Sequence, residues 1–222
     1  PFSNMASMWF ENEKTAAAQE ELLSCVKEAF RAKVPIVVMH AFCGFNNHNV
    51  TTYGVERFRT VVDFAEKLNV KIAFENTEGE EYLAALMEAF KNKKQVGFCI
   101  DTGHEMCYNH SKDMLSLYGD RLFCTHLNDN FGISDYNGDI TWLDDLHLLP
   151  FDGIADWKGI VKRLNSCGYN GELTFELNKK SKPGRHENDG YSQMNLLLFL
   201  TEAYKRAKKV AALKTRNGVT EQ

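Results

Sequence analysis

The chain has 222 residues, of which 44% are hydrophobic and 25% charged, and its formal net charge is −4. This length and composition suit one large α/β domain and argue against a disordered protein. The acidic balance gives no basic footprint for nucleic acid, no apolar run approaches the roughly 20 residues of a membrane span, and the first residues do not read as a signal peptide.

The six cysteines are scattered through mostly apolar segments. Cysteines in such surroundings are typical of a reduced core, so we expect free thiols and a cytoplasmic protein. The expected partner is a small molecule, further copies of the chain could form a homo-oligomer, and neither a membrane nor a nucleic acid is expected.

Helical and strand patterns alternate along the chain. Segments with apolar residues at helical spacing are separated by short runs of β-branched and aromatic residues. We expect helices at 14–33, 53–68, 80–91, 111–118, 156–166 and 191–212, strands at 35–40, 70–75, 96–101, 122–127 and 172–176, and a short strand near 146–149 inside a long polar loop. Strands that alternate with helices in this way predict a parallel sheet with right-handed crossovers.

Acidic and histidine side chains stand where these strands are expected to end. In a parallel α/β barrel the C-terminal ends of all strands open onto one face, so such side chains converge. Carboxylates and imidazoles gathered on one face provide the ligands that a divalent metal needs. The set consists of His40, Glu75, Asp101, His104, His126, Asp145, His147 and Glu176.

The number of expected strands falls two short of a closed (β/α)₈ barrel, which has eight strands and usually about 250 residues. The shortfall lies at the N-terminus, where Pro1-Phe2-Ser3-Asn4 reads like a loop. We therefore expect an α/β TIM barrel that lacks its first two strands in this chain, as a single domain over residues 1–213 with a tail at 214–222. Upstream residues are expected to complete the barrel in the full protein.

Five short motifs carry a family resemblance. They are IAFEN around Glu75, CIDTGH from Cys99, HLND from His126, D-x-H-x-x-P from Asp145, and FEL around Glu176. Each motif alone is weakly specific, but their order and spacing resemble the xylose isomerase-like TIM barrel superfamily. That superfamily includes sugar and sugar-phosphate isomerases and epimerases, the AP endonuclease family 2 enzymes related to endonuclease IV, and some dehydratases. The resemblance covers the chain to about residue 179.

The resemblance implies a first metal site held by Glu75, Asp101, His126 and Glu176. Three oxygen donors and one imidazole suit a six-coordinate ion, with Mn²⁺ expected first and Mg²⁺, Co²⁺ or Zn²⁺ as alternatives. Simpler explanations exist for each residue, among them an N-cap role for Asp101 and a salt bridge for Glu176. Because several carboxylates buried together are costly without a cation, the metal interpretation is favoured.

The remaining members of the set are candidates for substrate binding or for a second metal. His104 matches a substrate- or metal-binding histidine, and His40 matches the histidine after the third barrel strand. Asp145 and His147 match an Asp-x-His pair that supplies a further metal in the endonuclease branch. A hydrogen bond from His40 to a neighbouring loop and a salt link within the 129–150 loop are the simpler alternatives.

The resemblance favours a metal-dependent sugar or sugar-phosphate isomerase or epimerase that works through a metal-chelated enediolate. Glu75 and Glu176 would transfer the proton from opposite sides of the barrel mouth. The first alternative is an endonuclease IV-like AP endonuclease, which the acidic net charge and the lack of clustered basic residues after HLND disfavour. A metal-dependent dehydratase and a barrel that only binds a sugar or metal remain as further alternatives.

Overall fold

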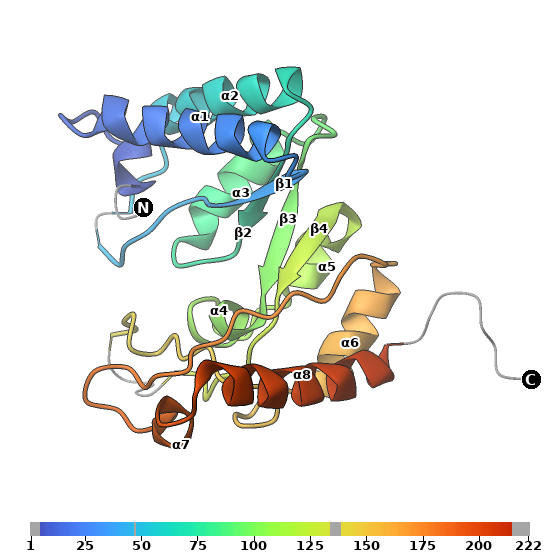
Figure 1. Ribbon diagram of the computed structural model, residues 1–222. Coiled ribbons are helices and arrows are strands. Elements are labelled where there is room, and N and C mark those ends of the chain that lie inside the picture. The colour runs from blue at the N-terminus through green and yellow to red at the C-terminus, as the bar shows by residue number, and fades with distance from the viewer. Residues whose placement is uncertain (1–4, 47, 134–138, 215–222) are drawn as a thin grey trace, which may run out of the picture. The chain divides into compact units, whose positions relative to one another are not determined.

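The computed structural model describes residues 5–46, 48–133 and 139–214. These residues belong to two compact units, Pro1–Cys99 and Ile100–Gln222 (Figure 1). The single barrel domain expected over residues 1–213, and the missing first strands, stay predictions. Residues 215–222 of the expected tail lie outside the described residues.

The first unit alternates helices and parallel strands, as the sequence predicts. Its elements are η1 (Met5–Met8), α1 (Thr15–Arg31), β1 (Ile36–His40), α2 (Thr52–Lys67), β2 (Lys71–Glu75), α3 (Glu80–Ala89) and the greater part of β3 (Val96–Asp101). β1 pairs with β2 and β2 with β3, both in parallel. In this register His40 lies opposite Glu75, and Glu75 lies opposite Cys99. The ends of neighbouring strands therefore carry the candidate site residues.

Trp9 is the centre of the aromatic core of this unit. It is fully buried, its ring centroid lies 4.6 Å from that of Tyr82, and its indole nitrogen donates to the Ala41 carbonyl over 2.7 Å. Gly54 in α2 makes room for the indole, because a Cβ at this position would lie 2.2 Å from the ring. This packing holds the loop that follows β1, which begins directly after His40.

The second unit carries the last two residues of β3 and seven further elements. These are α4 (Thr102–Cys107), α5 (Met114–Tyr118), η2 (Gly119–Arg121), β4 (Leu122–His126), α6 (Trp157–Ser166), α7 (Asp189–Ser192) and α8 (Leu196–Leu213). The four strands follow one another in the sheet in the order β1-β2-β3-β4. The expected α/β class with a parallel sheet is thus confirmed.

Two expected strands are wrong as regular elements. Segment 172–176 contributes one isolated parallel bridge, between Leu127 and Phe175, and the 146–149 segment contributes one antiparallel bridge, between Asp129 and Leu148. The hydroxyl of Thr125 accepts the amide of Thr174 over 3.0 Å, so a side chain takes the place of a ladder bond. Both segments nevertheless run beside the chain that follows β4, and their candidate residues reach the same region.

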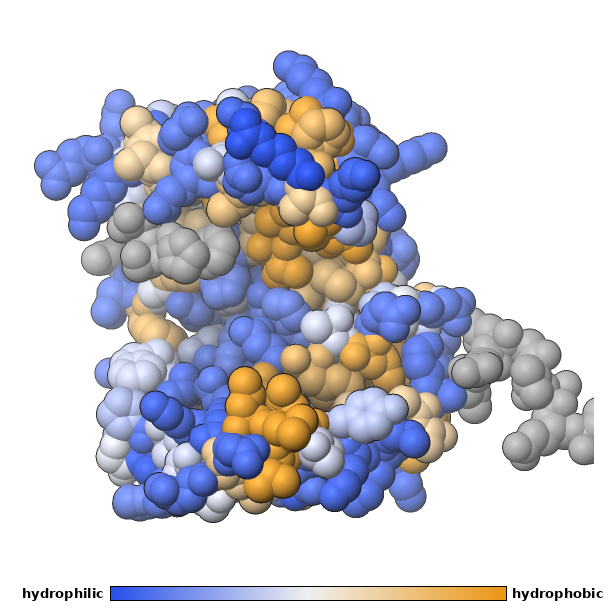
Figure 2. Space-filling view, viewed as in Figure 1, coloured by the Kyte–Doolittle hydropathy of each residue, from blue (hydrophilic) through white to orange (hydrophobic). Residues whose placement is uncertain are grey.

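Helix α8 carries apolar residues on its exposed side as well as on its buried side. Phe199 and Val210 are buried, whereas Leu197, Leu200 and Tyr204 are more than half exposed. Figure 2 shows the resulting hydrophobic patch over this helix. None of the described helices is long and apolar enough to cross a membrane.

Candidate metal centre

In the first unit, His40 and Glu75 form a contact between the ends of β1 and β2. The His40 Nε2 atom lies 3.5 Å from Glu75 Oε2, and its Nδ1 atom lies 3.0 Å from Cys43 Sγ in the following loop. Burial disfavours the charged imidazole, but the contacts with Cys43 and Glu75 outweigh it and raise the pKa of His40 to about 10. His40 therefore provides a positive partner for the buried Glu75 carboxylate. The Cys43 contact also agrees with the simpler expectation of a hydrogen bond to a neighbouring loop.

In the second unit, Asp101 ends β3 and begins α4. Its carboxylate is fully buried and accepts the His104 amide over 2.8 Å, which makes it the N-cap of the helix. The Asn128 side-chain amide donates to both oxygens, over 3.1 Å and 2.9 Å. The N-cap role considered from the sequence is therefore correct, and it uses only Oδ1.

His126 and Glu176 meet beside Asp101. His126 is the last residue of β4, and its Nδ1 atom lies 2.8 Å from Glu176 Oε2. Glu176 is held in place by its backbone amide, which donates to the Leu127 carbonyl over 3.2 Å. The ligand atoms of Asp101, His126 and Glu176 all lie within 4.8 Å of one another. Three of the four predicted ligands of the first metal thus converge within one unit, and Glu75 as the fourth ligand stays a prediction.

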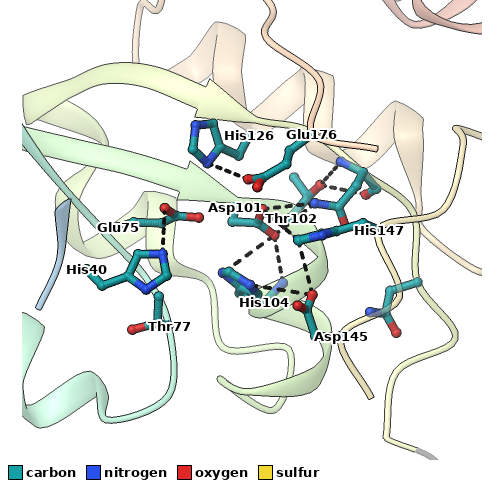
Figure 3. A network of polar contacts seen from close by, with 12 residues as sticks. His40, Glu75, Thr77, Asp101, Thr102, His104, His126, Asp145, His147 and Glu176 are labelled. Carbon is teal, nitrogen blue, oxygen red and sulfur yellow. Dashed lines mark hydrogen bonds and ion pairs between the residues drawn. The ribbon is translucent and has the colours of Figure 1, made fainter. Parts of the chain in front are cut away.

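A second group of polar side chains surrounds Asp145. Its Oδ1 atom lies 3.4 Å from His104 Nε2 and 3.2 Å from His147 Nε2, and its Oδ2 atom lies 3.6 Å from Lys182 Nζ. Figure 3 shows both imidazoles turned toward this carboxylate. Burial disfavours the charged form of Asp145, but the contact with His104 and the charges of His104, His147 and Lys182 lower its pKa to about 2.

The second group extends to Asp101. Its Oδ2 atom lies 3.8 Å from His147 Nε2, and the ligand atoms of Asp101, His104 and His147 lie within 4.8 Å of one another. His147 has a φ of 51°, in the left-handed region that non-glycine residues rarely adopt. Strained backbone of this kind recurs at active sites and ligand clamps. His104, Asp145 and His147 thus lie together next to the first group, and their role in binding a substrate or a second metal stays a prediction.

Unsatisfied polar atoms show that this donor set fits a cation. Asp145 Oδ1 and His147 Nε2 are buried 3.2 Å apart, and among the described residues neither makes a hydrogen bond of good geometry. Buried polar atoms are usually paired, so a carboxylate oxygen and an imidazole nitrogen that converge in poor hydrogen-bond geometry are suited to a shared cation. Together with Asp101, His126 and Glu176 they offer carboxylate oxygens and imidazole nitrogens, which divalent Mn, Co and Zn ions accept.

Four residues near these groups are not identified by the sequence analysis as site residues. Asn128 contacts Asp101, Thr102 contacts Asn128, and Cys43 contacts His40. Lys182 appears in the sequence only as one of several basic residues after Glu176. The signal for Asn128 was its place in the HLND motif, directly after the strand end that bears His126.

Comparisons with known proteins bear on the fold. A sequence profile described as the xylose isomerase-like TIM barrel matches residues 2–197. The uncharacterized protein y4fM of Sinorhizobium fredii is 34% identical over 155 residues, which are 64% of this chain and 47% of that protein. The chain thus spans about half the length of this relative.

Solved structures resemble the chain at low sequence identity. A D-psicose 3-epimerase from Clostridium cellulolyticum H10, solved with D-tagatose, gives a TM-score of 0.67 at 15% identity and covers 96% of this chain and 76% of its own. A D-tagatose 3-epimerase-like protein gives 0.62 at 21% identity, over 93% and 77%. A xylose isomerase domain protein from Planctomyces limnophilus gives 0.63 at 18% identity, over 90% and 68%. These likenesses concern the fold, and they confirm the predicted barrel class.

Proposed function

We propose, because this chain belongs to the xylose isomerase-like TIM barrel family, that it is a divalent-metal-dependent isomerase or epimerase of a sugar or sugar phosphate. The observation that carries the proposal is the convergence of Asp101, His126 and Glu176 within 4.8 Å. Support comes from solved structures of the same fold, whose names include a D-psicose 3-epimerase and an L-ribulose 3-epimerase.

Glu75 is proposed as the fourth ligand on the strength of the sheet register. It lies opposite Cys99 in the β2–β3 pairing, and Asp101 follows Cys99 by two residues on the same strand. Side chains two residues apart on a strand point to the same face. The register therefore supports a Glu75 carboxylate on the face that bears Asp101.

The proposed chemistry is proton transfer beside a carbonyl. A bound ion would polarise the carbonyl oxygen of the substrate and make the neighbouring C–H more acidic. Glu176 and Glu75 remove and return that proton, since a positioned carboxylate is a suitable general base. His126 orients the Glu176 carboxylate over 2.8 Å, and His40 holds the carboxylate of Glu75 at 3.5 Å. Return of the proton to the opposite face gives epimerisation, and transfer to the neighbouring carbon gives isomerisation.

The proposal is tested by solvent deuterium exchange with a panel of ketoses, aldoses and their phosphates. Glu75→Gln and Glu176→Gln keep an oxygen donor but remove the proton acceptor, so turnover should fall by roughly 10²–10⁴-fold. Deuterium incorporation from heavy water should fall in parallel. His186→Asn is the matched control, because this histidine side chain is 84% exposed and pairs only with Asp189 among the described ion pairs. Normal turnover without solvent deuterium in both Gln variants would refute the proton-transfer chemistry.

A second candidate is a metal-dependent phosphodiesterase that cleaves DNA at abasic sites, like endonuclease IV. The group of Asp101, His104 and His147, with Asp145 beside it, favours this candidate, because it offers ligands for further ions next to the first site. Metal analysis of the purified protein distinguishes the two. One ion per chain supports the sugar enzyme, whereas three ions and cleavage of an abasic-site duplex support the nuclease. Products that have lost water, in the assay with the panel of sugars and sugar phosphates, would identify the dehydratase alternative.

A further inference from the structure

Asn128 contacts three consecutive residues where β3 ends and α4 begins. Its side chain contacts Asp101, its backbone contacts Thr102, and its side-chain oxygen lies against Gly103. We propose that Asn128 is a positioning residue, which orients the Asp101 carboxylate toward the cation. This inference rests on the metal site of the proposed function.

The hydrogen bonds of Asn128 fix it relative to Asp101. Thr102 Oγ1 donates to the Asn128 carbonyl over 2.7 Å and accepts the Asn128 amide over 2.9 Å, so the backbone is held from both sides. The side-chain Nδ2 then donates to Asp101 Oδ1 over 3.1 Å and to Oδ2 over 2.9 Å. With the His104 amide also on Oδ1, the carboxylate has donors on both oxygens and cannot rotate freely.

The orientation of the Asn128 amide follows from its surroundings. The reversed orientation would place its oxygen against two carboxylate oxygens, which repel it, so Nδ2 must face Asp101. The consequence is a buried Oδ1 atom that has no hydrogen-bond partner within the part of the chain that the structure describes. An unpaired buried acceptor costs stability, so an asparagine with only a packing role would not be favoured here over an apolar residue. The donation to Asp101 is the interaction that this arrangement secures.

Gly103 provides the space that the unpaired oxygen occupies. A Cβ on residue 103 would lie 2.0 Å from Asn128 Oδ1 and 3.0 Å from its Cγ, so any side chain would displace the amide. Gly103 lies in α4 and its φ is not positive, so its backbone conformation does not itself require glycine. The glycine is therefore explained by contact with Asn128.

The test is calorimetric titration of the purified full chain with Mn²⁺ alone, with a thermal melt of each variant. Asn128→Leu keeps the size of the side chain and removes the donor, and it should weaken Mn²⁺ binding about 10–100-fold, as loss of residues that support metal ligands does. Gly103→Ala should have a similar effect, because it displaces the amide. Asn188→Leu is the control: this asparagine is also buried, its Oδ1 has no hydrogen-bond partner among the described residues, and its amide donates to the Lys180 carbonyl.

The double variant Gly103→Ala/Asn128→Leu separates positioning from general damage. If Gly103 matters only through Asn128, the double variant should bind Mn²⁺ no more weakly than Asn128→Leu alone. Unchanged Mn²⁺ affinity in folded Asn128→Leu or Gly103→Ala, or equal weakening in Asn188→Leu, would overturn the inference and leave the metal site standing. Equal Mn²⁺ affinities of Asp101→Asn and the unaltered protein would overturn the proposed function itself. If Asn128→Leu does not fold, the folded Gly103→Ala decides.

Discussion

Asp129 is the buried carboxylate on which the loop between β4 and α6 depends. It is fully buried, and four donors reach its two oxygens: the amides of Asn130 and Ala155 on Oδ1, and the Phe151 amide and the Trp157 indole on Oδ2, at 2.8–2.9 Å. The segment that it anchors follows directly after Asp145 and His147. We predict that Asp129→Asn destabilises the fold strongly although it changes only one atom.

The magnitude follows from the count of donors on each oxygen. An amide keeps one oxygen acceptor and places an NH₂ group where the other oxygen stood, so two of the four donors lose their acceptor in either orientation. Each buried donor left unpaired costs about 1–3 kcal/mol, so the loss is about 2–6 kcal/mol. Trp157→Phe removes one donor and leaves all other donors paired, so its cost from hydrogen bonding is about half as large.

Urea unfolding followed by circular dichroism measures these changes. Asp156→Ala is a reference, because it removes the N-cap bond to the Gly159 amide of 3.0 Å and should cost about 1 kcal/mol. A free energy of unfolding within 1 kcal/mol of the unaltered protein for Asp129→Asn would refute this reasoning, because it would mean that the four donors are satisfied in another way.

Two further predictions concern ion pairs and pH. Arg163→Leu removes two hydrogen bonds of 2.8 Å and 2.6 Å from the buried Glu105 carboxylate, and the free energy of unfolding should fall by about 3–5 kcal/mol in urea; a change below 1 kcal/mol would contradict it. Burial and the hydrogen bond to Asp152 raise the pKa of Tyr191 from 10.0 to about 12. The fold therefore favours the protonated phenol, and stability should decrease as pH rises from 10 to 12, less steeply in Tyr191→Phe; equal slopes in the two proteins would contradict this.

The strands that the sequence predicts correctly are runs of β-branched and aromatic residues with helices between them. A run of this kind that is buried on both faces is typical of a strand in a parallel sheet, as in VGFCID at β3, where all six residues are buried. Helix α4 was not predicted, because Thr102 and Gly103 have low helix propensity. It forms because the Asp101 side chain caps it and because Thr102 is held by Asn128.

The predicted strand at 172–176 shows what a sequence pattern cannot determine. LTFEL has the composition of a strand, but a strand also needs a neighbour that offers backbone groups in register. Here the Thr125 hydroxyl accepts the Thr174 amide, and a single bridge at Phe175 results. A full strand is not needed to place Glu176, because the single bridge at Phe175 suffices to bring it beside His126.

The candidate site was predictable in its residue types and not in its supporting contacts. Polar residues that follow predicted strands are visible in the sequence, and the structure places His104, Asp145 and His147 beside one another. The orientation of Asn128 follows from its donation to Asp101, with Gly103 of α4 providing the space, and these contacts cannot be read from one motif alone.

The most direct test of the central claim is an anomalous-diffraction map of crystals grown with Mn²⁺. We predict one strong peak with Asp101, His126, Glu176 and Glu75 as ligands at about 2.0–2.3 Å. A map without a peak at Asp101, His126 and Glu176, or a peak that contacts none of these three residues, would contradict the account.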